Sequence, residues 1–200
     1  VVLLFYTMPA WSIGLAWWLL QERPGRGSFV RLALALIGVI LVLKTPDTPW
    51  PVPQSLNDWL ALAGGAAFAL NNVMLRKLSF LPESDRMMAM FSGGTVMTAL
   101  TALVCMPLGL VTFPTDLAWW PYALGLALCM LGSNLSLQYG AARLPAHTTA
   151  LVMLSEIVFA TVSSVAWGVA LLDGRKALGG LLIVSAAILA TIESSDKEPT

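Results

Sequence analysis

Charged residues are scarce in this sequence. Lysine, arginine, aspartate and glutamate together number 22 among 200 residues, whereas a soluble domain of this length carries about 50. The 11 basic and 11 acidic residues cancel, so the chain has no net field that would attract nucleic acid or an anionic surface. Hydrophobic residues make up 58% of the chain, and its mean hydropathy is +0.79. This composition excludes an ordinary soluble domain and predicts a membrane protein.

Cysteine and histidine are also rare, and the common motifs of enzymes are missing. The two cysteines, Cys105 and Cys129, lie in apolar stretches, and the sequence holds one histidine. These residues form neither a metal-ligand pattern nor a disulfide framework, so no cofactor or metal is expected. The apolar stretches contain no HExxH, no GxSxG and no paired aspartates. We therefore do not expect an enzyme.

Several apolar stretches are long enough to cross a bilayer as helices, which takes about 20 residues each. A cleavable signal peptide is excluded, because the chain lacks a basic start and further apolar runs follow the first one. The connections are short, which favours a single helical bundle. We expect an all-α membrane protein with seven spans, at Val1 to Leu20, Ser28 to Lys44, Asp58 to Leu75, Met87 to Val111, Ala118 to Ala142, Thr148 to Leu171 and Ala177 to Ile192.

The positions of lysine and arginine predict the orientation, because translocated loops contain few of either. We expect the side richer in them to be cytoplasmic, which places the start of the chain outside and the tail 193–200 inside. The protein would then be a multi-pass protein of a cell membrane, and we expect the bacterial inner membrane. One side holds Arg23, Arg26, Arg31, Arg76, Lys77, Arg86, Arg143 and Lys197, and the other holds Lys44, Arg175 and Lys176.

The first two spans and the last two share a pattern when Val1 is aligned with Thr149. Each pair consists of a long span, a short basic connection and a shorter span rich in small and branched apolar residues. Identities at this offset are few, for example Leu3 with Leu151. The charge count makes the first and sixth spans run in opposite directions. Such inverted repeats are typical of secondary transporters.

These segments resemble the EamA-type proteins of the drug/metabolite transporter superfamily. The stretch FYTMPAWSIGLAWWLLQERP with LALIGVILVL is similar to that family's fourth and fifth helices, with Pro9, Glu22 and Gly38 at motif positions. The stretch QYGAARLPAHTTALVMLSEIVFATVSSVAWG with LGGLLIVSAAILA is similar to the end of its eighth helix and to its ninth and tenth. Two departures are Ile157, where the family usually has proline, and Ala170, at the place of Glu22.

The resemblance implies a ten-span bundle of two inverted five-helix repeats, of which this chain holds seven spans. Residues 1–44 would end the first repeat, residues 45–56 would form an extracytoplasmic linker, and residues 57–192 would be the complete second repeat. Residues 193–200 would form a cytoplasmic tail. On this interpretation three helices would precede Val1 in the natural protein.

Glu156 is the one carboxylate in the middle of a predicted span. An ionisable group in the hydrocarbon costs about 3 kcal/mol even on insertion scales, so its presence in a span marks a candidate functional site. Apolar surroundings favour the neutral form of a carboxyl, which makes Glu156 a candidate proton carrier or a partner for a substrate ammonium. The alternative is a protonated or hydrogen-bonded residue that packs between helices.

Polar amides and aromatic residues come to a similar depth in other spans. Amides can bind a zwitterion because each one both donates and accepts hydrogen bonds, and aromatic walls suit small organic ligands. Interhelical hydrogen bonding and packing are the alternatives for each of them. The candidate substrate-binding residues are Tyr6, Trp11, Asn71, Asn72, Asn134, Gln138 and Glu156.

Three pairs of adjacent glycines are expected to permit close approach between helices. They are Gly64 with Gly65, Gly93 with Gly94, and Gly179 with Gly180.

The sequence therefore favours a carrier for small metabolites, such as amino acids or related compounds, that works by alternating access. Its expected partners are the lipid bilayer, a metabolite substrate and, as a candidate coupling ion, the proton. The alternative is a multi-span receptor or sensor without enzymatic activity. A retinal-binding receptor is excluded because the last span has no lysine for a Schiff base. Nothing in these residues selects a direction of transport or an oligomeric state.

Overall fold

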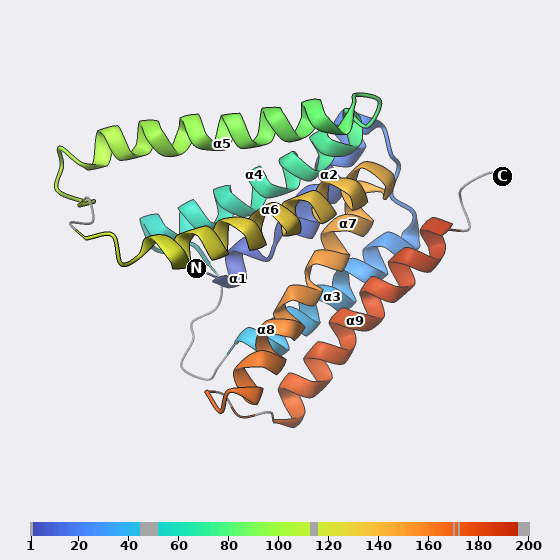
Figure 1. Ribbon diagram of the computed structural model, residues 1–200. Helices are drawn as coiled ribbons and strands as arrows, with labels where there is room; N and C mark the ends of the chain where they lie inside the picture. Colours follow the sequence, from blue (N-terminus) through green and yellow to red (C-terminus); the bar gives the residue numbers. More distant parts are fainter. Residues whose placement is uncertain (1, 45–51, 113–115, 170, 172, 196–200) are drawn as a thin grey trace. The chain divides into compact units, whose positions relative to one another are not determined.

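The protein is all-helical in the computed structural model, which describes residues 2–44, 52–112, 116–169, 171 and 173–195 (Figure 1). No strand occurs in these residues, which confirms the prediction of an all-α protein. The helices are α1 Val2–Phe5, α2 Met8–Leu20, α3 Arg26–Leu43, α4 Leu56–Lys77, α5 Glu83–Cys105, α6 Trp120–Arg143, α7 Ala146–Met153, α8 Ser155–Ala166 and α9 Gly174–Ser195.

Five helical segments are long and apolar enough to cross a membrane: Val2–Leu20, Arg26–Leu43, Glu83–Cys105, Ala146–Ala166 and Gly174–Ile192. They are consistent with a multi-pass membrane protein. The other two predicted spans coincide with α4 and α6, of 22 and 24 residues. These helices are long enough but less apolar, because small and amide residues replace part of the leucine and valine.

Some predictions lie outside the described residues. They are the ones that concern Val1, most of the linker 45–56, Ala170, Lys197 and the end of the tail 193–200.

Two predicted spans end earlier than expected, and a glycine explains each end. The span predicted to reach Val111 ends at Cys105, and Gly109 follows with φ +67°. The span predicted to reach Leu171 ends at Ala166, and Gly168 follows with φ +71°. The amide of the next residue then bonds back to a helix carbonyl, from Leu110 to Cys105 at 3.0 Å and from Val169 to Ser164 at 2.9 Å. Both ends are therefore glycine-based caps.

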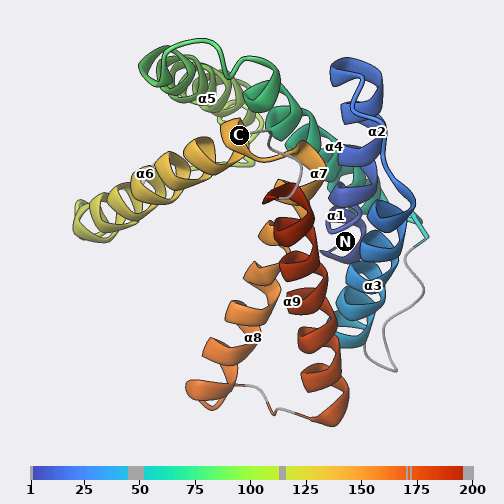
Figure 2. The same cartoon turned by 90° about the vertical axis from the view of Figure 1, so that its right-hand side faces the viewer.

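The chain divides into two compact units. The first unit, Val1–Lys77 with Leu144–Thr200, contains α1 to α4 and α7 to α9. Here α3 packs along α9, and α4 packs along α1 and α2; α3 and α9 lie side by side in both views (Figures 1 and 2). Its core consists of Met8, Ala35, Val39, Val42, Leu151, Leu154, Ile157, Ile183, Ala186 and Ala190.

The α3 and α9 helices cross at two glycines. A Cβ on Gly38 would lie 2.7 Å from the carbonyl oxygen of Gly179, and a Cβ on Gly179 would lie 2.7 Å from the carbonyl oxygen of Gly38. Gly38 also faces Ile183, and Gly179 faces Val42. The crossing is therefore reciprocal and antiparallel, and only a residue without a side chain fits on either helix.

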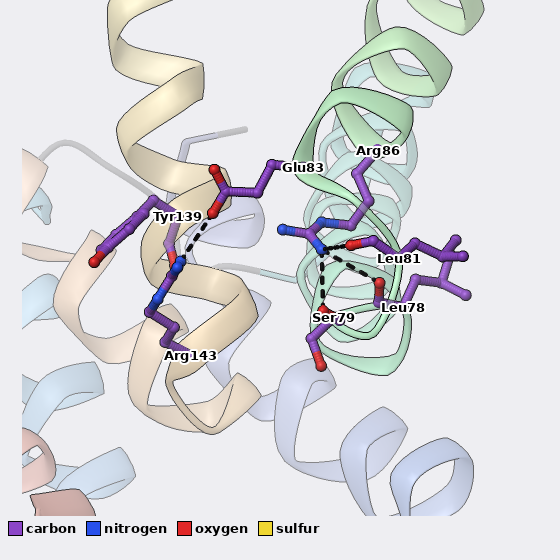
Figure 3. A network of polar contacts seen from close by, with 7 residues as sticks. All are labelled: Leu78, Ser79, Leu81, Glu83, Arg86, Tyr139 and Arg143. Carbon is purple, nitrogen blue, oxygen red and sulfur yellow. Dashed lines mark hydrogen bonds and ion pairs between the residues drawn. The ribbon is translucent and has the colours of Figure 1, made fainter.

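The second unit, Leu78–Arg143, contains α5 and α6 and is held at one end by two arginines (Figure 3). Buried Arg86 donates from one nitrogen to the carbonyl oxygens of Leu78, Ser79 and Leu81 at 3.4, 3.2 and 2.6 Å, so it caps the turn before α5. Arg143 on α6 bonds to Glu83 of α5 at 3.2 Å, and its guanidinium lies 3.5 Å above the ring of Tyr139.

Candidate functional site

Two of the seven predicted site residues meet in the first unit. The hydroxyl of Tyr6 donates a hydrogen bond to Oε1 of Glu156 at 3.1 Å, across a sequence separation of 150 residues. Tyr6 lies in the interruption between α1 and α2, and Glu156 lies in the first turn of α8. The side chain of Glu156 is exposed and accepts this one hydrogen bond, so the functional and the packing interpretations of Glu156 both stay predictions.

Both residues lie at a break in a helix that the sequence predicted to be continuous. Pro9 is in the first turn of α2, where its missing N–H is tolerated, but it cannot bond to the carbonyl of Phe5 four residues earlier. The first span therefore breaks at Tyr6 and Thr7. The sixth span breaks at Leu154, where amides bond three residues back instead of four, as in a 3₁₀ turn.

The two breaks occupy corresponding positions in the proposed repeat. Tyr6 and Leu154 are 148 residues apart in the sequence. This is the same offset that aligns Val1 with Thr149. Pro9 causes the first break, but Ile157 stands at its place in the second. A sequence pattern could therefore reveal the first break and not the second.

Helix α4 supports the first break through a glycine. A Cβ on Gly65 would lie 2.5 Å from the carbonyl oxygen of Phe5, the carbonyl that Pro9 leaves without its helical partner. A Cβ on the adjacent Gly64 would meet only the Phe5 ring, at 3.6 Å. Of these two predicted contact glycines, Gly65 is the one where a side chain cannot fit. Gly93 and Gly94 make no such contact among the described residues.

A groove of about 330 Å³ opens beside Tyr6. On α8 the lining residues Ile157, Ala160, Thr161 and Ser164 follow the i, i+3, i+4, i+7 spacing of one helix face. The polar lining residues are Tyr6, Thr161, Ser164 and Lys176, and the apolar ones are Val2, Val42, Leu43, Ile157 and Ala160. Thr161, Ser164 and Lys176 were missed by the sequence analysis; the one available signal was the recurrence of hydroxyls at helical spacing after Glu156.

The hydroxyls of this groove use their hydrogens within the protein. Thr161 donates to the carbonyl of Ile157 at 2.7 Å, and Ser164 donates to that of Ala160 at 2.7 Å. Lys176 donates from Nζ to the carbonyl of Leu171 at 2.8 Å. The groove thus presents several oxygen acceptors and one ammonium.

Three other predicted residues of this unit do not line the groove. Asn72 is fully buried on α4, with its amide nitrogen 4.0 Å from the sulfur of Met153 and its amide oxygen without a hydrogen-bond partner. Asn71 is half-buried on the same helix. Trp11 is 41% exposed on α2. The structure therefore gives Asn72 a place beside the second break, and it gives Trp11 no part in the groove.

Asn134 and Gln138 belong to the second unit. Asn134 donates to the carbonyl of Met130 on its own helix at 2.9 Å. Gln138 is buried and donates to the sulfur of Met90 at 3.2 Å, while its amide oxygen has no partner. It lines a groove of about 400 Å³ that includes Glu83, Met87 and Tyr139. Asn134 is not among the lining residues of this groove.

Glu22 joins the ends of three helices in the first unit. Its Oε1 lies 3.7 Å from Nε of Arg76 at the end of α4, and the amide of Ala146 at the start of α7 donates to the carboxylate. Burial raises the pKa of Glu22 above its usual value, although Arg76 and the Ala146 amide both lower it. The loss of hydration therefore outweighs the two favourable partners.

This raised pKa predicts how stability depends on pH. A carboxyl with a raised pKa in the folded state binds its proton more tightly when folded, so its contribution is greatest at acid pH and is lost as pH rises through the folded pKa. We expect the wild type to lose stability relative to Glu22→Gln as the pH rises above the usual pKa of a glutamate, about 4. Thermal unfolding in detergent at several pH values measures this, with the exposed Glu83→Gln as control. A wild type that gains stability over Glu22→Gln with rising pH would contradict the prediction.

Comparison with known proteins finds a likeness of fold. No family model matches this chain, and no curated protein matches it. A solved structure described only as a crystal structure of a protein matches with a TM-score of 0.72 and 20% sequence identity, over 98% of this chain and 68% of that one. At this identity the similarity concerns the fold alone, so the chain shares its helical architecture with a protein of known structure.

Proposed function

We propose that this chain forms seven spans of a secondary transporter of the EamA type, a carrier of small metabolites that works by alternating access. The observation that carries the proposal is the pair of interrupted helices, whose breaks lie at corresponding positions and bring Tyr6 and Glu156 within 3.1 Å. Interrupted helices are characteristic of the substrate and ion sites of secondary transporters. A carboxylate in a membrane-spanning segment is in most cases a functional group.

The α3 and α9 crossing supports the inverted repeat that the proposal requires. The two helices are the last of their respective repeats in the proposed arrangement. Gly38 faces Gly179 and Ile183, while Gly179 faces Gly38 and Val42, so the two helices run antiparallel where they meet. The last helices of two inverted repeats are expected to run antiparallel in this way.

The proposed carrier acts on amino acids or related compounds and lies in the bacterial inner membrane, with the proton as candidate coupling ion. Transport is tested in vesicles that contain the protein and a pH gradient, with a panel of labelled amino acids and small amines. We expect saturable movement of at least one member. If no member of the panel moves faster than in protein-free vesicles, the proposal fails.

Orientation gives a separate prediction. In the proposed topology the turn before α5 faces the cytoplasm and the connection before α6 faces outside. In a protein free of Cys105 and Cys129, an impermeant thiol reagent applied to intact cells should therefore label Asp116→Cys and leave Ser84→Cys unlabelled. Both positions are exposed, so access is not limited by folding. The reverse labelling pattern would overturn the topology.

A further inference from the structure

The groove beside Tyr6 has an unusual balance of hydrogen-bond donors and acceptors. A hydroxyl has a single hydrogen to donate. Tyr6 uses its hydrogen on Glu156, Thr161 on Ile157 and Ser164 on Ala160. The three hydroxyl oxygens therefore meet a ligand as acceptors only.

The carboxylate at this end of the groove also favours a ligand group that donates hydrogen bonds. Tyr6 connects the groove to the carboxylate of Glu156, and an ionised carboxylate also only accepts. A ligand group that matches this set must donate several hydrogen bonds and carry positive charge. A primary ammonium, with three N–H donors, satisfies both requirements.

Lys176 determines at which end of the groove the ammonium group of a ligand lies. It is the one cation among the described lining residues, and it is fixed by its bond to the Leu171 carbonyl at 2.8 Å. Like charges repel, so a ligand ammonium avoids Lys176 and is directed toward Tyr6 and Glu156. The volume of about 330 Å³ suits a small molecule, since it is near the lower limit of ligand pockets.

We propose that this groove binds small primary amines in their protonated form, with the ammonium held by the oxygens of Tyr6, Thr161 and Ser164 beside Glu156. The inference rests on the proposed function and deepens it, because it names the class of substrate. It also predicts weaker binding of two classes. Carboxylates would meet acceptors near Tyr6 and a donor at Lys176, and quaternary ammonium ions have charge but no N–H to donate.

Binding of three probes to the protein in lipid nanodiscs tests the proposal by calorimetry at pH 7. n-Butylammonium, butyrate and tetramethylammonium separate charge from hydrogen-bond donation. We expect saturable binding of n-butylammonium and about tenfold weaker binding of tetramethylammonium, because its N–H bonds to the hydroxyls are lost. Butyrate should also bind about tenfold more weakly than n-butylammonium, because Lys176 is the one cation that its carboxylate meets among the described lining residues. Equal binding of n-butylammonium and either of the other two probes would overturn the assignment.

Adjacent serines on α8 provide a matched control. Ser163 and Ser164 both donate to the Ala160 carbonyl, at 3.0 and 2.7 Å, but Ser164 lines the groove and Ser163 does not. Ser164→Ala and Thr161→Val should each weaken n-butylammonium binding about tenfold. Thr161→Ser, which keeps the hydroxyl, and Ser163→Ala should bind as the wild type does. Circular dichroism verifies that each variant is folded; a folded Ser164→Ala with unchanged affinity would contradict the proposal.

The binding assay separates this inference from the transport proposal. If n-butylammonium binds but no solute moves in vesicles, the amine site stands and the carrier function fails. If amino acids move but n-butylammonium does not bind, the carrier function stands and the amine site fails.

Discussion

Glu156→Gln should abolish pH-dependent transport without unfolding the protein. The substitution is nearly isosteric, and the amide oxygen of glutamine can still accept the bond from Tyr6, which is 3.1 Å in the wild type. Glutamine cannot take up or release a proton, so any coupling that passes through this carboxyl is lost. Uptake or efflux in vesicles, measured with and without a pH gradient, should show transport that no longer responds to the gradient.

Two further variants make this result specific. Tyr6→Phe removes the bond to Glu156 but keeps the carboxyl, so transport should slow about tenfold or more while its dependence on pH remains. Glu22→Gln changes a carboxyl beyond the end of α2 and should retain pH-dependent transport. Normal transport with an unaltered pH profile in Glu156→Gln would assign Glu156 to packing, and the proton role would have to be given up.

Gly179→Ala should separate α3 from α9 and strongly destabilise the first unit. The new Cβ would lie 2.7 Å from the backbone oxygen of Gly38 and 2.8 Å from a methyl of Val42, and the backbone cannot move aside without shifting the whole helix. Overpacking of this kind costs about 1–3 kcal/mol or more. Thermal unfolding in detergent, followed by circular dichroism, should show a clearly lower midpoint.

Gly180→Ala is the matched control on the same helix. There a Cβ would make only ordinary contact, with Val158 at 3.8 Å. Both substitutions gain about 1 kcal/mol of helix propensity, so their difference isolates the contact. Gly38→Ala should resemble Gly179→Ala, and the double variant should cost less than the sum, because one separation relieves both contacts. Equal stability of Gly179→Ala and Gly180→Ala would show that the helices do not meet at these glycines.

The glycine results illustrate how far sequence reasoning reaches at a helix contact. Adjacent glycines in Gly64–Gly65 and Gly179–Gly180 predict close approach, and one member of each pair has it. Which member is in contact depends on the rotation of the helix against its neighbour. Gly38, the partner of Gly179, is 141 residues away in the chain, so no local pattern could pair the two.

In the candidate site, too, the sequence pattern indicates one residue and the packing of the helices supplies its partner. Glu156 is recognisable in the sequence because an ionisable residue in a long apolar run has an evident cost. Its partner Tyr6 is an ordinary aromatic residue near the start of the chain, and only the packing of the two broken helices brings them together. Trp11 lies in the same predicted span as Tyr6, but it is exposed and does not line the groove.

The sequence by itself determined the all-helical class and the apolar segments, because hydropathy and length are local properties. Pro9 is a local signal for the first break, although the span was predicted to be continuous. Tertiary structure alone decided the second break at Leu154, which has no proline, and the meeting of Tyr6 with Glu156. It also decided that Thr161, Ser164 and Lys176 share a groove. Each of these depends on how helices distant in the chain pack together, and a contact between distant residues leaves no periodic signal in one sequence.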